Sequence, residues 1–464
     1  MTADAPKSSE FRYSITNDVS FLYQVYCSYI ILYKNSNCEK GFLPPDLLKR
    51  SLNILVRKYY HPVAGWFQSR GDDIDVVFYT DKFNDPPFST QTLDMDCATL
   101  SRHVSESNIE LLVPKAPSGV IKPESPDIPM FLAQATYLES NEAVALGVNY
   151  HHSLMDGCAF WMFMNNWASL CKQLHAQGDR TEFDLPYPPT FGFPDISHLR
   201  DPSKTFAHPE YALVSPDKCF KEFQPGTHKT VETVLNISAA QQVKIRQQAK
   251  EFGVSFIEMV SAMLWKGSND VRFQARPEIG PGPSLYTCTV NPRSHLGVSS
   301  NLCASPVINT SCELTVAQVA ELDLRSVAHL VRDSINKCTG EYLFSSFSYL
   351  HAQRKKELEN ERAGRQDQKV MLVYVCAMPV KCTVSVSRTF PIYQTDFGFG
   401  APEYVRPPFL PFDGCMRVWP TPQYTCGGSD AALEVYVSQP DYVDLSLSPL
   451  LRPLTEKEPV ITPH

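Results

Sequence analysis

One segment, residues 143–174, constrains the fold of this chain more than any other. It begins with an apolar run from Ala143 to His151, continues through the heptad His-His-Ser-Leu-Met-Asp-Gly at 151–157, and ends in apolar residues at helical spacing. An alternating apolar run predicts a strand, and apolar residues three and four apart predict an amphipathic helix. The segment therefore predicts a strand, a tight turn and a helix, with two histidines and a carboxylate in the turn.

The turn supplies the main candidates for chemistry, His152 and Asp156. Because successive side chains on a strand point to opposite faces, only one of the two adjacent histidines can face a given side. We predict that His152 faces a cavity and that His151 packs or orients. Gly157 would let the backbone enter the helix tightly. Asp156 could cap that helix or pair with an arginine, and we expect this structural role rather than contact with a substrate.

A chain of 464 residues is longer than one hydrophobic core usually accommodates. The length therefore predicts two domains or two halves. Residues 184–203 are rich in proline and glycine and show no sustained period, which indicates a crossover between the halves. We therefore predict an N-terminal half at 1–183, a linker at 184–229 and a C-terminal half at 230–464. Both halves are expected to be of the α/β class.

Predicted helices and strands occur in both halves. Helices are expected at 47–59, 239–251 and 255–266 and directly after the heptad, and strands at 75–79, 130–137, 143–151, 231–237, 286–290, 370–377, 382–387 and 433–437. The run of mixed charge at 357–368 is most simply a solvated surface helix or loop.

Composition and charge narrow the functional classes. Hydrophobic residues make up 43% of the chain and charged residues 20%, which suits a soluble globular protein. The formal net charge is -8. No block of basic residues with interleaved aromatics appears, so nucleic acid is not an expected partner. Neither a secretory signal nor a membrane span is apparent, so we expect a cytoplasmic protein. The cysteines form no Cys-x-x-Cys motif and are expected to be reduced apolar fillers.

Several well-known catalytic motifs are absent from the sequence. It contains no Gly-x-Ser-x-Gly nucleophile elbow, which leaves a serine hydrolase unsupported. It also lacks the glycine-rich patterns of dinucleotide and nucleotide-triphosphate sites. No His-Glu-x-x-His pattern occurs, and the adjacent histidines at 151 and 152 are a poor metal pair, so no bound metal is expected.

Two further motifs lie in the C-terminal half. Residues 396–400 read Asp-Phe-Gly-Phe-Gly, and the glycines Gly398 and Gly400 around the aromatics, next to Asp396, suggest a tight backbone where a loop inserts. Arg293 follows a predicted strand. A buried arginine at that place needs a carboxylate partner, because an unpaired buried charge is costly, and Asp156 is a candidate.

Taken together, these motifs resemble those of the BAHD-type CoA-dependent acyltransferases, in particular the fungal branch that includes trichothecene 3-O-acetyltransferases. The heptad matches the family's His-x-x-x-Asp-Gly, and residues 393–400 are close to the family's Asp-Phe-Gly-Trp-Gly. The other matching segments, in the same order, are Leu48–Phe67, Ser255–Trp265 and Val290–Arg293.

The resemblance implies two chloramphenicol-acetyltransferase-like α/β domains with an active-site channel at their interface. His152 would be the general base that takes a proton from an acceptor hydroxyl of a secondary metabolite. Asp156 would pair with Arg293 and hold the histidine turn, while the 396–400 loop would be structural. Acyl-CoA, with acetyl-CoA as the expected form, would be a co-substrate, no cofactor would be bound permanently, and the enzyme would act as a monomer.

The chain departs from the family pattern near the expected oxyanion. Family members often carry a Ser/Thr-Ser-Trp element there, and this chain has Ser385 and Ser387 with a valine between them. Ser385 keeps a hydroxyl and is a candidate oxyanion donor, but Ser387 stands where the tryptophan is expected. Phe399 likewise replaces a tryptophan in the glycine-rich loop.

Two other functions stay open at this point. One is a stand-alone condensation domain of the nonribosomal-peptide type, which would take its acyl group from a carrier protein. The length of the chain and the segment at 61–65 favour free acyl-CoA over that alternative. The other is a family member that binds or rearranges a metabolite without acyl transfer.

Overall fold

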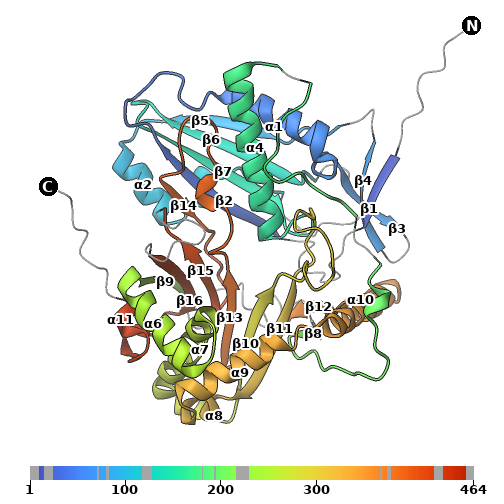
Figure 1. Cartoon of the computed structure of the whole chain (residues 1–464), viewed down its shortest axis with the longest axis vertical. Coiled ribbons are helices and arrows are strands. Elements are labelled where there is room, and N and C mark those ends of the chain that lie inside the picture. Colours follow the sequence, from blue (N-terminus) through green and yellow to red (C-terminus); the bar gives the residue numbers. More distant parts are fainter. Residues whose placement is uncertain are drawn as a thin grey trace, which may run out of the picture.

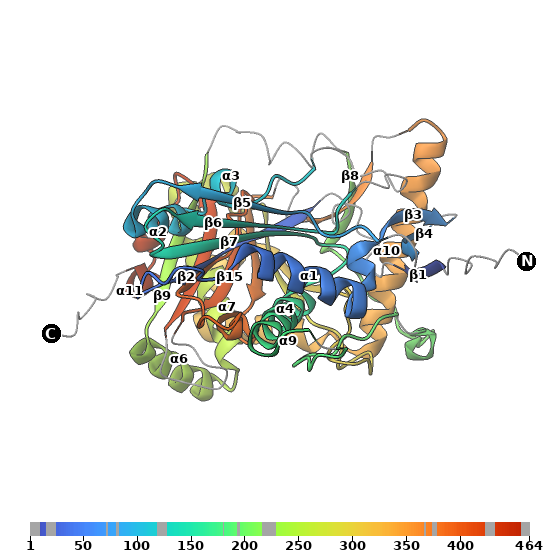
Figure 2. The same ribbon diagram turned by 90° about the horizontal axis from the view of Figure 1, so that it is seen from above.

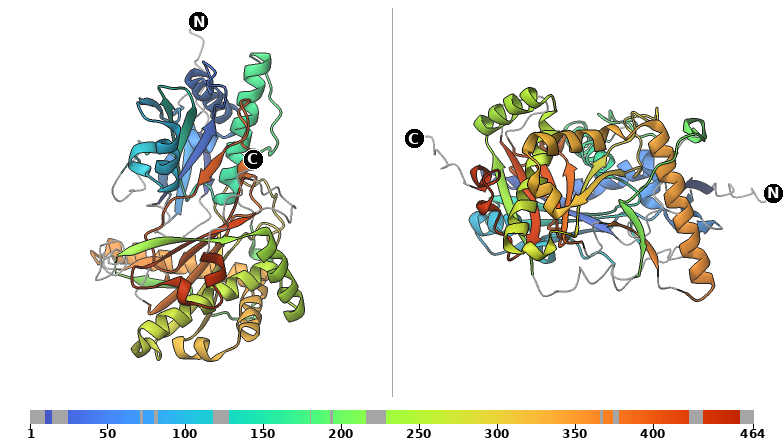
Figure 3. Two further views of the ribbon diagram at one scale, coloured as in Figure 1. Left: turned by 90° about the vertical axis from the view of Figure 1, so that its left-hand side faces the viewer. Right: turned by 90° about the horizontal axis from the view of Figure 1, so that it is seen from below.

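The structure is a computed structural model, and it describes residues 10–14, 25–70, 73–79, 83–117, 128–179, 181–192, 195–215, 229–365, 368–373, 378–422 and 432–455. Two α/β layers face each other, each built around one main β-sheet (Figures 1 and 3). This agrees with the expected fold class. The predicted boundaries at 183 and 230 remain a prediction.

The first main sheet is mostly antiparallel, and helices cover both of its faces. Its strand order is β14 (Tyr404–Arg406), β2 (Tyr26–Lys34), β7 (Ala143–His151), β6 (Phe131–Leu138) and β5 (Phe88–Leu93). Tyr29, Ile31 and Tyr33 of β2 pack into the core beneath α1 (Pro45–Tyr59) and α4 (Gly157–Gln177). Ile30 and Leu32 pack on the opposite face, against α2 (Cys97–Ser105) and α3 (Ile109–Leu112). This alternation buries β2 on both faces.

The second main sheet is mixed and has helices on its outer face. Its strand order is β11 (Ile308–Thr315), β10 (Pro283–Val290), β13 (Val380–Val386), β15 (Cys415–Pro420), β16 (Leu433–Pro440) and β9 (Thr230–Ile237). Alternate apolar residues of these strands pack against α6 (Ala239–Phe252), α7 (Phe256–Ala275), α8 (Val316–Glu321) and α9 (Leu324–Asn336). The other face of the sheet is therefore turned toward the first layer (Figure 1).

Smaller elements gather at one end of the two layers (Figure 2). They are the sheet of β1 (Glu10–Ser14), β4 (Asp73–Tyr79) and β3 (Trp66–Arg70), the pair of β8 (Tyr211–Val214) and β12 (Lys369–Leu372), and α10 (Gly340–Arg362). Short helices complete the described chain at His61–Ala64, Ser197–Leu199, Pro277–Ile279, Ile392–Gln394, Leu445–Leu447 and Arg452–Thr455. The expected linker at 184–229 thus contributes a strand, β8. Within the described residues, no helix has the length and apolar character needed to span a membrane.

One strand crosses between the layers. β14 comes from the C-terminal half of the chain but pairs with β2 at the edge of the first sheet, with Val405 opposite Ile31 (Figure 1). The chain then returns to the second sheet as β15, where Trp419 packs into the core of the first layer. Nε1 of Trp419 donates to the carbonyl oxygen of Val405 at 3.1 Å, so the two contacts lie side by side and join the layers there.

Two expectations about local structure need correction. The charged run at 357–368 is not wholly solvated, because Glu357 is fully buried, pairs with Arg354 at 3.0 Å and accepts the Val370 N–H at 3.4 Å. This inner face of α10 packs on β12. The strand expected at 370–377 ends at Leu372, and residues 374–377 lie outside the described part of the chain.

Candidate active site

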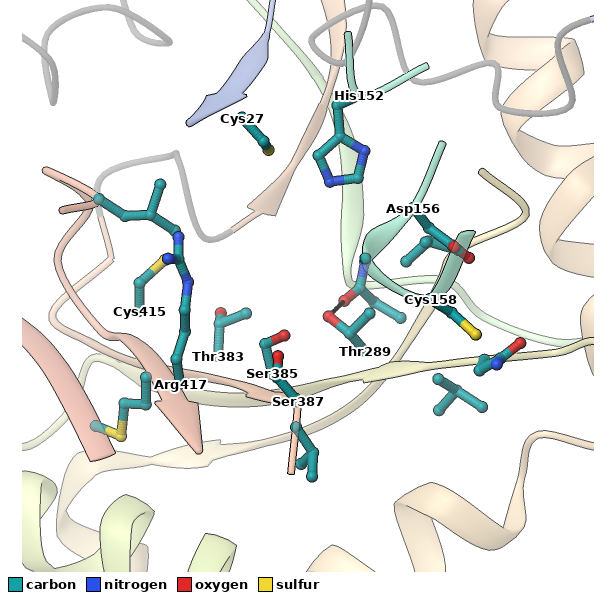
Figure 4. A pocket seen from close by; sticks show the side chains of 18 of the residues that line it. Cys27, His152, Asp156, Cys158, Thr289, Thr383, Ser385, Ser387, Cys415 and Arg417 are labelled. Atoms are coloured by element: carbon teal, nitrogen blue, oxygen red, sulfur yellow. Dashed lines mark hydrogen bonds between the residues drawn. The ribbon is translucent and has the colours of Figure 1, made fainter. Parts of the chain in front are cut away.

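A cavity of about 300 Å³ lies between the two main sheets. Its walls come from β2 and β7, from the start of α4, and from β10, β13 and β15 (Figure 4). Its polar lining residues include His152, Thr289, Thr383, Ser385, Ser387 and Arg417. Both layers are therefore needed to form it.

His152 follows the last residue of β7, and its imidazole reaches into this cavity (Figure 4). The His152 N–H donates to the carbonyl oxygen of Val25 at 3.0 Å, which fixes the backbone of the turn. Burial lowers the pKa of His152 below its ordinary value, and the positive charge of Arg417 adds to this; Asp156 and a backbone hydrogen bond oppose it. The imidazole is thus neutral at neutral pH and able to accept a proton.

His151 points away from the cavity and is fully buried. Its Nδ1 lies 2.9 Å from the Oγ of Ser153, and its ring meets Tyr26 and Phe67 edge-on at centroid distances of 5.1 and 4.6 Å. The two adjacent histidines therefore occupy opposite sides of the strand end, as expected.

Asp156 and Arg293 form a buried, two-pronged ion pair, so the expected contact is present. Nη1 of Arg293 donates to Oδ2 at 2.6 Å, and Nη2 donates to Oδ1 at 3.1 Å. Oδ1 also accepts the Ala159 N–H at 2.9 Å, which caps the start of α4. Both oxygens of the carboxylate are engaged, although Asp156 borders the cavity.

Arg293 is held by further hydrogen bonds on the side of the second layer. Nη2 donates to the carbonyl oxygens of Leu302 and Ala304 at 2.9 and 3.1 Å, and Nη1 donates to Asn291 at 3.0 Å. Burial works against the charge of Arg293, but Asp156 raises its pKa above the ordinary value. The pair therefore fastens the histidine turn to the loop after β10.

Gly157 has a different role from the one expected. It is the first residue of α4 and does not have the positive φ that favours glycine. A Cβ atom at this position would instead lie 3.0 Å from the ring of Phe390, which comes from the C-terminal half. A larger residue here would crowd Phe390, whose ring would have to move by a few tenths of an ångström.

Ser385 and its neighbours form the floor of the cavity. Thr383, Ser385 and Ser387 alternate along and just beyond β13, so that all three line the cavity (Figure 4). Thr383 accepts a hydrogen bond from the hydroxyl of Thr287 at 2.7 Å. Ser385 lies beside Arg417 in the register of the parallel pair β13 and β15.

The glycine-rich loop lies outside the cavity, with none of Asp396, Gly398 and Gly400 in its lining. Oδ1 of Asp396 accepts the N–H groups of the two glycines at 2.8 and 2.9 Å, and Lys172 of α4 donates to Oδ2 at 2.7 Å. The glycines have φ values of 101° and 106°, which other residues rarely adopt. Phe397 is fully buried in the first layer. The loop docks the C-terminal half onto α4.

Arg417 is a cavity residue that the sequence analysis missed. It lies on β15 between Met416 and Val418, whose side chains pack against the helices of the second layer. Its Nη1 donates to the carbonyl oxygen of Pro408 at 2.9 Å. No strand was expected at 415–420, so nothing in the sequence placed this guanidinium near the histidine turn.

The sequence matches the model that describes the Transferase family over residues 2–441. The chain belongs to this family. Membership confirms the resemblance to BAHD-type acyltransferases that the motifs indicated.

Relatives of this Transferase-family chain include two curated plant enzymes. It is 24% identical over 326 residues to hydroxycinnamoyl-CoA:5-hydroxyanthranilate N-hydroxycinnamoyltransferase HHT1 of Avena sativa, covering 67% of this chain and 66% of that protein. It is 25% identical over 311 residues to shikimate O-hydroxycinnamoyltransferase of Nicotiana tabacum, covering 63% and 64%. The chain thus spans just under two thirds of the length of these relatives.

The family fold is also seen in a solved structure. TRI101 of F. graminearum, complexed with coenzyme A and T-2 mycotoxin, superposes with a TM-score of 0.70 at 18% identity, covering 94% of this chain and 96% of that one. At this identity the likeness is one of fold.

Proposed function

We propose that this protein is an acyl-CoA-dependent O-acyltransferase, with acetyl-CoA as donor and a hydroxyl of a small secondary metabolite as acceptor. One observation carries the proposal: the neutral imidazole of His152 opens into a cavity between the two layers, while the neighbouring carboxylate of Asp156 is bound to Arg293. A positioned neutral histidine is suited to act as general base at neutral pH.

In the proposed reaction His152 accepts the proton of the acceptor hydroxyl as its oxygen attacks the thioester carbonyl. The carbon–sulfur bond then breaks, and the proton held by the imidazolium passes to the departing CoA sulfur. The ester and free CoA are the products, and the histidine returns to its neutral form. Asp156 and Arg293 act by positioning, because their charged groups are bound to each other.

Direct transfer to the acceptor is favoured over an acyl-enzyme. Two of the cysteines that line the cavity, Cys27 and Cys158, are alternative nucleophiles. Burial raises the pKa of each thiol to about 11, so both remain protonated at neutral pH. A protonated thiol is a poor nucleophile.

We further propose that the Ser385 hydroxyl donates to the oxyanion that forms at the thioester carbonyl. Ser385→Ala is then expected to lower kcat about 10²-fold. Steady-state kinetics with varied acetyl-CoA should show little change in KM, because the donor acts in the transition state. Ser385→Thr keeps the hydroxyl and is the matched control. An unchanged kcat in the alanine variant would remove Ser385 from the reaction.

The pH dependence of the rate follows from the lowered pKa of His152. Only the neutral imidazole accepts a proton, so kcat/KM should be constant near neutral pH and fall at acid pH. The midpoint of the fall is expected below the ordinary pKa of histidine, because burial lowers the pKa in the free enzyme. A profile from about pH 5 to pH 8 checks this. A midpoint above the ordinary histidine value would contradict it.

The proposed function is tested by incubating the purified protein with acetyl-CoA and a panel of hydroxylated metabolites. Free CoA, measured with a thiol reagent, should appear together with a product heavier by one acetyl group. Longer acyl-CoA donors form a second arm. No CoA release from any donor by folded protein, or transfer only from an acyl group loaded on a carrier protein, would overturn the proposal.

A further inference from the structure

The charges around the cavity are unbalanced. Among the described residues that line it, Arg417 is the only lysine or arginine, and Asp156 is the only carboxylate. Asp156 is already paired with Arg293. The cavity therefore carries one cation without a carboxylate partner, facing the same space as His152 (Figure 4).

The contacts of Arg417 leave most of its guanidinium unused. One N–H donates to the Pro408 carbonyl oxygen, and no ion pair holds the side chain among the described residues. Burial removes water from such a cation, which is unfavourable unless a bound anion compensates for the loss. A guanidinium offers a planar fork of donors that fits a carboxylate with two parallel hydrogen bonds.

The position of Arg417 aims this fork into the cavity. Met416 and Val418 pack toward the helices of the second layer, and Trp419 packs into the core of the first layer, so alternation along β15 turns Arg417 toward the first layer. Burial is the main cause of the lowered pKa of His152, and the charge of Arg417 contributes to it. The guanidinium therefore lies close enough to His152 to affect it electrostatically.

We propose that Arg417 binds a carboxylate of the acceptor, so that the substrates of this protein are small hydroxy acids. The inference rests on the proposed acyl transfer at His152 and names the acceptor class for it. The acceptor hydroxyl lies at His152 and its carboxylate at Arg417. The hydroxyl side chains of β13, Ser385 among them, line the cavity below the acceptor. Leu410 and Phe412 supply an apolar wall for the body of the molecule.

The single cation argues for a carboxylate rather than a coenzyme phosphate. Phosphate groups are usually held by several cations or backbone N–H groups together. Arg417 has no second lysine or arginine beside it in the described lining. A cavity of about 300 Å³ is also at the lower end of ligand pockets, which suits a compact acceptor.

The test compares hydroxy acids with their methyl esters as acceptors, using acetyl-CoA and measuring kcat/KM. The wild type is expected to prefer the acid, and Arg417→Gln to lower kcat/KM for the acid about 10- to 100-fold while changing that for the ester little. Arg417→Lys keeps the positive charge but loses the planar set of N–H donors. Its kcat/KM for the acid should therefore lie between those of the wild type and Arg417→Gln. Arg50→Gln is the control, because Arg50 is an exposed arginine paired with Asp179.

A binding measurement separates this inference from the proposed function. Calorimetric titration of the acid in the absence of acetyl-CoA should show binding to the wild type and weaker binding to Arg417→Gln. If no acceptor is acylated but the acid still binds the wild type more tightly than Arg417→Gln, the proposed function is wrong and the carboxylate site is supported. Equal binding of the acid to both proteins would overturn the site.

Three kinetic results would also overturn the carboxylate site. The first is equal use of acids and esters by the wild type. The second is an equal loss of kcat for both acceptors in Arg417→Gln, which would place Arg417 at the reacting carbonyl. The third is a sign in Arg417→Gln that the side chain binds the donor. That sign would be a selective rise in KM for acetyl-CoA, or a selective loss of transfer to an ester from malonyl-CoA, whose acyl group carries a carboxylate.

Discussion

Replacing His152 with alanine is expected to lower kcat/KM about 10²- to 10⁴-fold, the contribution of a positioned general base. The loss follows because no other described side chain in the cavity is a neutral base: Asp156 is bound to Arg293, and Cys27 and Cys158 are protonated thiols. The melting temperature should change little, since the His152 side chain borders the cavity rather than the core.

The control for this variant is the adjacent histidine. His151 is fully buried against Tyr26 and Phe67, so His151→Ala is expected to lower the melting temperature. The base itself stays in place in that variant. A His152→Ala enzyme with near-normal rates would reject His152 as the base, whatever its stability.

Arg293→Ala is expected to lower the free energy of unfolding by about 3–5 kcal/mol, because it leaves a buried carboxylate without its counter-charge. The two side chains of the pair are only 3% and 5% exposed. The substitution also removes donors from the carbonyl oxygens of Leu302 and Ala304. Urea denaturation measures the loss. Asp156→Asn should be destabilised in the same direction, because it leaves Arg293 without a counter-charge.

An exposed pair with similar geometry provides the comparison. Arg57 donates to both carboxylate oxygens of Asp85 at 2.8 and 2.7 Å, but these side chains are 51% and 36% exposed. Arg57→Ala should therefore lower the free energy of unfolding by no more than about 1 kcal/mol. Equal small effects at Arg57 and Arg293 would contradict the structural role of the buried pair.

The histidine turn could be predicted from sequence because its signals are local. The apolar strand, the turn and the helix follow one another at 143–174, and alternation alone separates His151 from His152. The Asp156–Arg293 contact needed one more argument, that a buried arginine requires a carboxylate. Asp156 was a candidate for that carboxylate, and the resemblance to the acyltransferases implied the pair.

The features that could not be predicted depend on residues far apart in sequence. β14 is only three residues long, and its place beside β2 is set by the packing of two layers. The close approach of Phe390 to Gly157 brings together two residues that are far apart in the chain. Arg417 faces the cavity because of the strand order of the second sheet. None of these follows from periodicity or turn chemistry within a short window.

The central claim is direct acyl transfer, with His152 as base, between acyl-CoA and an acceptor in the cavity. It is tested most directly by a single-turnover experiment with acetyl-CoA labelled in the acetyl group, following the masses of the protein and the product together. The expected result is label that passes to the acceptor while the protein mass stays unchanged, with transfer strongly slowed in His152→Ala. An acetylated protein that forms before the product, or normal transfer by His152→Ala, would contradict the account.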